Sequence, residues 1–179
     1  MKFLSQEQKE VIAKAHGISI EAQGKSSIIW GHLSLEWLFG PPPTDLSEND
    51  ASLALLISSM DQPRQRALLS GDLEAAGEKR LRRVWREGSL DVTSLTIWQI
   101  NHHGSSTSTE VETVNQLHPH HAVLSLDGEH RFSFPHPSTI RTLTESGVRR
   151  HRLDIEGDVT YYFEGIERSW VENIWIAIL

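Results

Sequence analysis

The chain has 179 residues, of which 38% are hydrophobic and 23% charged. These values are ordinary for a soluble globular protein, and we expect residues 1–179 to form a single domain. The formal net charge of −7 gives the chain no general attraction for nucleic acid, so contact with phosphate needs a local basic patch or a bound cation. Cysteine is absent, which excludes disulfides and thiolate metal sites.

The first forty residues predict a short helix followed by strands. Ser5 and Gln8 form a capping-box pattern, and Gly17 ends the apolar periodicity that follows it. Gly40 and three prolines after it predict an extended, exposed crossing. Strand-like segments lie between these points, at 18–21 and 26–30.

The middle of the chain predicts a hairpin and then a helix. Residues 52–58 and 67–69 are apolar and strand-like, and the polar segment 59–66 between them is typical of a hairpin loop. Residues 73–87 place apolar side chains on one helical face and basic side chains on the other, and Gly88 ends the helix.

The second half alternates strands with helices, which favours an α/β layered domain. Residues 94–100 form a predicted strand that leads directly to His102 and His103. Thr107 and Glu110 form a second capping box, which predicts a helix over 108–117. Further strands are expected at 122–126, 148–153 and 159–163, and a further helix at 138–146, ended by Gly147.

The last ten residues, 170–179, are nearly all apolar. They predict a final strand or helix packed on the core, or else a segment that docks on something outside this chain. No apolar run is long enough for a membrane-spanning helix, and the N-terminal residues lack the apolar core of a signal peptide. We therefore expect the chain to be soluble as written.

Asp72 and the pair His102–His103 are the first candidates for chemistry, because each follows a predicted strand. A carboxylate beside Gly71 at a strand end can bridge cations, although Asp72 can equally cap the helix that begins near Leu73. Two adjacent histidines in extended chain point to opposite sides, so one can bind a metal while the other meets substrate or orients a ligand. The alternative for the two histidines is a polar surface loop.

Other histidines and serines carry weaker signals. His136 lies between two prolines in a stiff loop. His118, His120 and His121 are expected in a solvated loop, because nothing in the sequence holds them in one geometry. Ser105 and Ser106 follow the histidine pair, but no Gly-x-Ser-x-Gly elbow surrounds them, which argues against a serine hydrolase.

These segments carry a family resemblance when they are taken in order. The run comprises Asn49-Asp50-Ala51-Ser52, Leu69-Ser70-Gly71-Asp72-Leu73-Glu74, His102-His103-Gly104-Ser105 and Pro135-His136-Pro137. It resembles the metallo-β-lactamase-like domain of the ComEC-type DNA-internalisation competence proteins, over about residues 33–163. The resemblance implies an αββα sandwich with a two-metal centre at one edge of its sheets. It also implies metal-dependent hydrolysis of phosphodiester bonds.

The resemblance carries roles over to individual positions. Asp72 matches the aspartate that bridges two metals, and His103, with His102 beside it, matches the histidine pair expected to bind metal or contact phosphate. The resemblance thus gives Asp72, His102 and His103 as catalytic candidates. It gives Asp72, His103 and His136 as candidate metal ligands, with Phe134 where many relatives carry a further histidine. Asn49 and Ser52 match a turn that supports the strand before Asp72.

One element of the family pattern is missing. The His-x-His-x-Asp-His loop that supplies most metal ligands has no counterpart, since His16 and His32 stand alone. The chain therefore resembles the C-terminal half of the fold, with an incomplete N-terminal half. Its zinc or manganese site would be incomplete, and the chain alone is expected to be inactive.

Partners and location follow from the same resemblance. It implies single- or double-stranded DNA as a partner, together with a missing N-terminal half or a membrane channel. It also implies attachment to a bacterial inner-membrane protein, with the domain outside the cytoplasm. Two alternatives remain open: a soluble metal-dependent hydrolase of a small phosphoester, and a non-catalytic, partner-binding relic of the fold.

Overall fold

The computed structural model describes residues 20–23, 25–39, 45–62, 65–87, 95–126, 133–163 and 175–178. The helix expected after Ser5 and the proline-rich crossing at 40–43 lie outside these residues. Among the helices that are described, none is both long and apolar enough to cross a membrane.

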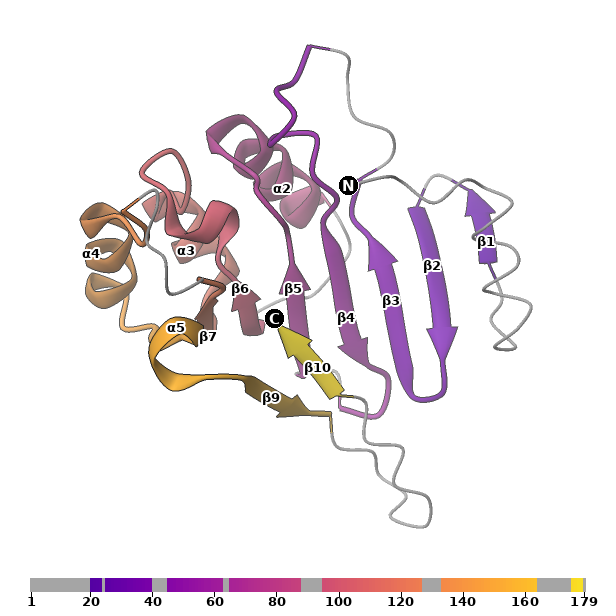
Figure 1. Cartoon of the computed structure of the whole chain (residues 1–179). Coiled ribbons are helices and arrows are strands. Elements are labelled where there is room, and N and C mark those ends of the chain that lie inside the picture. The colour runs from indigo at the N-terminus through magenta and orange to yellow at the C-terminus, as the bar shows by residue number, and fades with distance from the viewer. Residues whose placement is uncertain are drawn as a thin grey trace.

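A mixed eight-stranded sheet, in the order β1 to β8, forms the centre of the structure (Figure 1). Neighbouring strands from β1 to β5 are antiparallel, and those from β5 to β8 are parallel. Parallel neighbours need a crossover, and a helix lies in the chain between each such pair. The strands are β1 Ile20–Gln23, β2 Lys25–Trp30, β3 Leu33–Trp37, β4 Leu55–Ser59, β5 Arg66–Leu69, β6 Leu95–Gln99, β7 Pro119–Leu124 and β8 Arg149–Arg152.

Three helices follow the parallel strands and pack on one face of the sheet. They are α2 Ala75–Glu87, α3 Val111–Leu117 and α4 Pro137–Glu145. Each contributes side chains to the larger core, such as Trp85 of α2, Leu117 of α3 and Leu143 of α4. The α/β class expected from the alternation is therefore confirmed.

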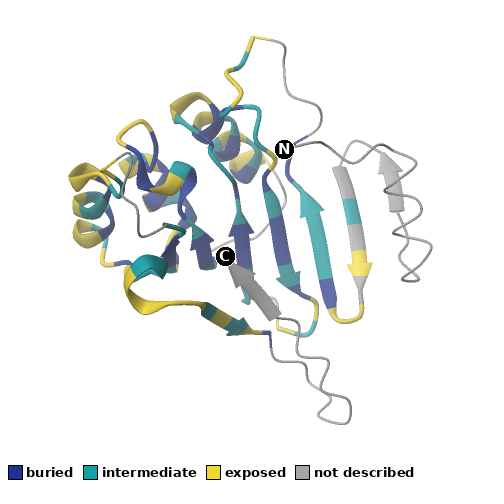
Figure 2. Cartoon of the chain, viewed as in Figure 1, coloured by how far each residue is buried: buried dark blue, intermediate teal, exposed yellow. Residues whose placement is uncertain are grey.

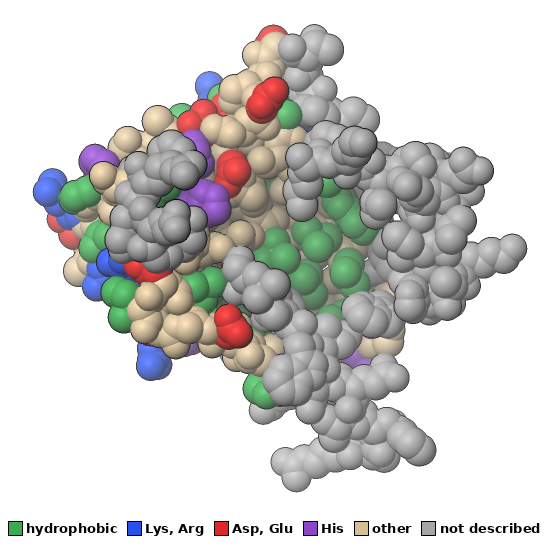
Figure 3. Space-filling view, in the orientation of Figure 1, with side chains coloured by type: hydrophobic (Ala, Val, Ile, Leu, Met, Phe, Trp, Pro, Cys, Tyr) green, Lys and Arg blue, Asp and Glu red, His purple; other side chains and the backbone are tan. Residues whose placement is uncertain are grey.

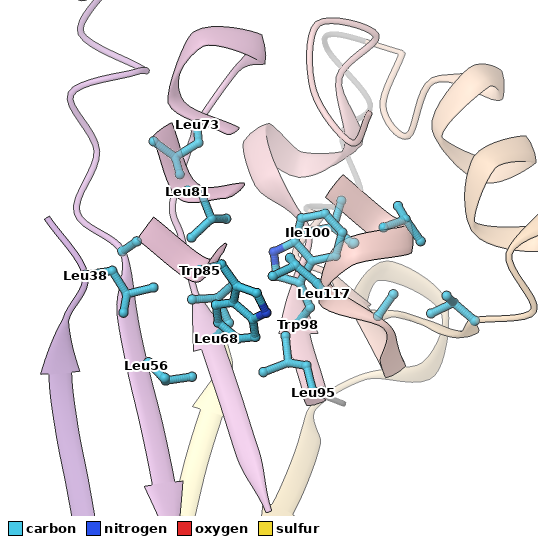
Figure 4. Close-up of a cluster of buried hydrophobic side chains, with 14 of the residues drawn as sticks. Leu38, Leu56, Leu68, Leu73, Leu81, Trp85, Leu95, Trp98, Ile100 and Leu117 are labelled. Atoms are coloured by element: carbon cyan, nitrogen blue, oxygen red, sulfur yellow. The ribbon is translucent and has the colours of Figure 1, made fainter. Parts of the chain in front are cut away.

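The larger core lies between these helices and the sheet (Figure 4). Trp98 of β6 is fully buried at its centre, and Leu68 of β5 and Leu81 of α2 are also fully buried there. Burying a large aliphatic or aromatic side chain contributes roughly 1.5–3 kcal/mol to stability. The Trp98 ring also needs a polar partner, and its Nε1 donates to Ser70 Oγ at 3.0 Å.

The opposite face of the sheet carries a smaller core. Leu33, Ile57 and Val123 are buried there, and Phe163, just after β9 Val159–Tyr162, packs with them. β9 pairs antiparallel with β10 Trp175–Ile178, so the expected final strand is confirmed for those four residues. The burial of the central strands is visible in Figure 2, and hydrophobic side chains gather over the sheet in Figure 3.

Several element boundaries differ from those expected. β3 was not expected; it joins the predicted strand at 26–30 to the β4–β5 hairpin. The expected strand 148–153 is wrong at its end, because β8 stops at Arg152 and the one-turn helix α5 Leu153–Glu156 follows. The expected strand 122–126 begins earlier, at Pro119, so the three histidines expected in a loop lie at or beside the start of β7.

The capping box expected at Thr107 and Glu110 is also wrong. α3 begins at Val111 with Glu110 as its N-cap, and the Glu110 side chain accepts no hydrogen bond from the amides of the first turn. Thr109 lies before it with φ of 62°, a left-handed conformation that interrupts the helix. The Thr107 hydroxyl instead donates to Glu74 Oε1, 33 residues away, at 2.7 Å.

Candidate functional site

The candidate site lies where β5 and β6 end. These strands are parallel neighbours, with Leu69 opposite Gln99, so the segments that follow them emerge at the same edge of the sheet. Ser70–Glu74 follows β5, and the short 3-10 segment Asn101–Gly104 follows β6. Loops at the carboxyl ends of parallel strands are a common place for binding and catalytic residues. Figure 3 shows histidine and acidic side chains lying together on this face.

The turn before Asp72 is held by the segment before β4. Gly71 has φ of 57°, and a Cβ there would lie 3.2 Å from the Ser52 side chain. The Asp72 amide donates to Ser52 Oγ at 3.2 Å. Ser52 therefore supports this turn directly, in the segment where the resemblance expects a supporting role.

Asp50, and not Asp72, caps α2. Its Oδ1 accepts from the Glu74 amide at 2.9 Å and from the Gly77 amide at 2.7 Å. The interpretation of Asp72 as the helix cap is thus wrong, and α2 begins at Ala75 rather than at residue 73. With the cap supplied from elsewhere, the Asp72 carboxylate faces the site, and its side chain is 46% exposed.

His102 and His103 do not lie in extended chain. Both are left-handed, with φ of 46° and 54°, so the expectation that they point to opposite sides fails. Their ring centroids are 6.4 Å apart, and Phe134 lies beside both, at 5.6 Å from His102 and 6.3 Å from His103. Phe134, at the position where the resemblance leads us to expect a histidine, therefore packs against the pair.

His103 faces Asp72 with a nitrogen that carries no proton when the ring is neutral. Its Nδ1 lies 2.6 Å from the Ser125 carbonyl oxygen, which can only accept, so Nδ1 is the donor. The other nitrogen, Nε2, lies 3.5 Å from Asp72 Oδ1. In neutral imidazole two acceptors then face each other, and either a proton or a metal ion between them relieves the repulsion. A histidine that donates Nδ1–H to a carbonyl is a common arrangement of metal ligands.

His102 pairs with a second carboxylate, Glu74. Its Nδ1 lies 3.3 Å from Glu74 Oε1, and the two side chains are 22% and 24% exposed. Glu74 Oε1 also accepts from the Thr107 hydroxyl. Glu74 lies within the run quoted for the resemblance, but its pairing with His102 was not expected, because it depends on which way the left-handed histidine turn points.

His136 occupies a different position. It is the N-cap of α4, and its Nδ1 accepts from the Ser138 amide at 3.3 Å. Its own amide donates to the Gly104 carbonyl at 2.8 Å, which ties this loop to the histidine turn. Over the described ranges, no group of three or more His, Cys, Asp or Glu side chains is placed to hold a metal. Asp72 and His103 therefore form a pair, and a ligand role for His136 stays a prediction.

A buried polar network under the site joins its two loops. Glu78 of α2 is 0% exposed, and Asn101, also fully buried, donates to its Oε1 from Nδ2 at 2.8 Å. Asn101 Oδ1 accepts from Ser70 Oγ at 2.5 Å. Ser70 precedes Asp72 and Asn101 precedes the histidines, so this chain of bonds sets the spacing between the two loops.

Glu78 also holds the segment before α3. Its Oε1 accepts from the Thr109 amide at 2.5 Å, and its Oε2 accepts from the Glu110 amide at 2.9 Å and the Thr113 hydroxyl at 2.6 Å. Burial raises the pKa of Glu78, against the opposing effect of these hydrogen bonds. A lone glutamate inside an amphipathic helix gives no sequence signal for this role, apart from its place on the apolar face.

A second histidine cluster lies elsewhere on the sheet. His121 Nδ1 is 2.9 Å from His151 Nε2, and His151 Nδ1 is 3.0 Å from Glu156 Oε2. Burial, and then the charge of His151, lower the pKa of His121. The solvated-loop interpretation is wrong for His121, which is half-buried on β7.

A pocket of about 500 Å³ adjoins the loop after the histidines. It lies among the segment 106–110 and the first turns of the helices that surround it. Its lining is rich in hydroxyl groups: Ala75, Ser106, Thr107, Ser108, Thr109, Glu110, Val111, Glu112, Ser138, Thr139 and Thr142. Thr107 links the pocket to the histidines, because its hydroxyl bonds to Glu74, which in turn faces His102.

Comparison with known proteins finds two similar sequences. The chain is 28% identical over 166 residues, 90% of its length, to ComE operon protein 3 of Bacillus subtilis. It is 33% identical over 117 residues, 65% of its length, to Recombination protein 2 of Haemophilus influenzae. No family model matches the chain. The matched segments cover 20% and 14% of those two proteins, so the chain is similar to one part of each of two much longer proteins.

Proposed function

We propose that this chain is part of a metal-dependent phosphodiester hydrolase that acts on DNA during its uptake, with Asp72 and His103 as metal ligands. The observation that carries the proposal is that His103 Nε2 faces Asp72 Oδ1 at 3.5 Å, while Nδ1 is held by the Ser125 carbonyl. The similarity to ComE operon protein 3 supports the link to DNA uptake.

The donor set fits a divalent metal in kind but not in number. An imidazole nitrogen and a carboxylate oxygen are suitable ligands for zinc or manganese, whose sites take four to six ligands. We propose that the remaining ligands come from the His-x-His-x-Asp-His loop of the other half of the fold, which this sequence does not contain. This assignment matches the proposal that the chain is the C-terminal half of a metallo-β-lactamase-like sandwich.

Each residue then has a distinct part. A bound metal would supply an activated water and offset charge on the phosphoryl oxygens. His103 and Asp72 would hold it, with the Ser125 carbonyl fixing the ring of His103. Glu74 faces Nδ1 of His102 at 3.3 Å without a hydrogen bond, and the Nε2 of His102 would contact the phosphate or its leaving oxygen.

Calorimetric titration of the chain with Mn²⁺ and Zn²⁺ tests the metal assignment. We expect saturable binding that Asp72→Asn and His103→Ala each abolish. His120→Ala is the matched control, since His120 is exposed near the amino end of β7, away from Ser125. Binding that survives both substitutions, or that His120→Ala weakens equally, would refute the assignment.

The substrate is tested with the chain joined to the segment that precedes the matched part of ComE operon protein 3 in that protein. Manganese-dependent cleavage of DNA that Asp72→Asn removes would support the proposal. Cleavage of a small phosphodiester alone would instead favour the soluble phosphoesterase. A well-folded fusion that binds no metal would favour the non-catalytic alternative.

A further inference from the structure

The hydroxyl-lined pocket beside the histidine turn has a composition that the metal site does not explain. Seven of the eleven residues in its lining are serine or threonine, and none is lysine or arginine. Its volume, about 500 Å³, lies within the range of pockets that bind small molecules. The hydroxyls of Thr107, Ser108, Ser138 and Thr139 bond to other groups of the protein, which leaves those of Ser106, Thr109 and Thr142.

One of these hydroxyls is buried without a partner. Thr109 is 3% exposed, and its Oγ1 forms no hydrogen bond in the structure. Buried polar groups in proteins are almost always bonded, and Thr139, the other buried threonine of the lining, donates to the Gly104 carbonyl, so the Thr109 hydroxyl is an exception. The hydroxyls of Ser106 and Thr142, nearer to solvent, are available beside it.

The electrostatics of the pocket favour an anion only weakly. Glu110 is paired with Arg82 at 2.5 Å, so its charge is largely offset, whereas Glu112 lies exposed at the lining. The first turn of α4 also lines the pocket, and a helix start carries partial positive charge, whereas the start of α2 is already capped by the Asp50 carboxylate. Donors without formal charge can therefore bind a phosphate here, with modest affinity.

We propose that this pocket binds a phosphodiester group of the substrate strand, through Ser106, Thr109 and Thr142. This group is the neighbour, in the same strand, of the phosphodiester that is cleaved. This inference rests on the proposed function, because it treats the strand as the substrate. Thr107 connects the two places, since it lines the pocket and bonds to Glu74 beside His102. The pocket would thus hold the strand while the adjacent phosphate lies at Asp72 and His103.

Fluorescence anisotropy with a labelled oligothymidylate, in EDTA, tests the pocket apart from any metal. Thr109→Val and Thr142→Val remove one hydroxyl each with little change of shape, and Ser106→Ala does so at an exposed position. Each is expected to weaken binding about fivefold, the effect of one neutral hydrogen bond. Thr144→Val is the control, because Thr144 is exposed on α4 and bonds only the Ile140 carbonyl.

Three further measurements test the pocket assignment: competition by small ligands, salt dependence and the melting temperature. Inorganic phosphate and thymidine 5′-monophosphate should compete with the oligonucleotide, whereas thymidine should not. Affinity should change little with salt, because no cationic side chain lines the pocket. Thr109→Val should leave the melting temperature of the free chain unchanged or raised, since its hydroxyl bonds nothing there.

Absence of saturable binding, equal weakening by Thr144→Val, or competition by thymidine would each overturn the pocket assignment. A steep salt dependence that all four variants retain would place binding on a basic surface instead, and would also overturn it. Asp72→Asn should leave binding in EDTA intact. Failure here is therefore distinct from failure of the metal titration.

Discussion

Replacing Glu78 with glutamine should loosen the junction between the two loops that carry Asp72 and the histidines. Both carboxylate oxygens accept a backbone amide, Oε1 from Thr109 and Oε2 from Glu110. The side-chain NH2 group of glutamine can occupy either position, and in both it meets a backbone N–H that it cannot accept from. The substitution is nearly isosteric, so the effect comes from hydrogen bonding and not from packing.

The size of the effect follows from the bonds on one oxygen. Either orientation removes two of the four bonds that Glu78 accepts and leaves a buried donor without a partner. At about 1.5 kcal/mol for each bond to a charged group, the free energy of unfolding should fall by roughly 3 kcal/mol. For a chain of this size the melting temperature should fall by roughly 6–12 °C.

Thermal and urea denaturation measure this loss. Glu112→Gln is the control, because it makes the same chemical change on the exposed side of α3. A melting temperature for Glu78→Gln within about 2 °C of the wild type would refute the reasoning. Metal titration of the same variant adds a second readout, since a loosened Asn101 should weaken binding at Asp72 and His103 even at temperatures where the chain stays folded.

Three further predictions concern the same elements. Asp50→Ala removes the acceptor of the Glu74 and Gly77 amides and should lower the free energy of unfolding by about 1–2 kcal/mol in urea denaturation; an unchanged midpoint would show that α2 needs no cap. Gly77→Ala should also destabilise, despite alanine's better helix propensity, because its Cβ would lie 2.5 Å from Leu73 Cδ2 and 2.8 Å from Asp50 Oδ1; a raised melting temperature would contradict this. The third prediction concerns pH. Because burial raises the pKa of Glu78, protonation of its carboxyl adds stability that is full below the unfolded value of 4.5 and is lost as pH rises through the folded pKa. The stability gap to Glu78→Gln should therefore narrow with rising pH toward the value given above for the charged carboxylate, and a gap that widens would reverse the sign.

Local patterns in the sequence were enough to find the elements that carry the site. The strands before Asp72 and before His102 are short apolar runs, and α2 has a clear amphipathic pattern, so each was found within a few residues. Strand β3 was missed because it occupies an interrupted, half-buried stretch, Leu33–Trp37, whose place depends on pairing with β2 and β4.

By itself, the sequence determined that Asp72 follows one strand and that His102 and His103 follow another. When two such strands are parallel neighbours, the residues that follow them lie close together at one edge of the sheet. Tertiary structure alone decided how they are used. The left-handed turn at His102 and His103 sends both rings to one side, Asp50 takes the capping role from Asp72, and Glu78 joins the two loops. The hydrogen bonds to Asp50 and Glu78 link residues more than twenty positions apart in the sequence. Neither these bonds nor the histidine turn produce a periodic pattern in the sequence. Their stabilising effect depends on buried donors that come within reach only when the chain is folded.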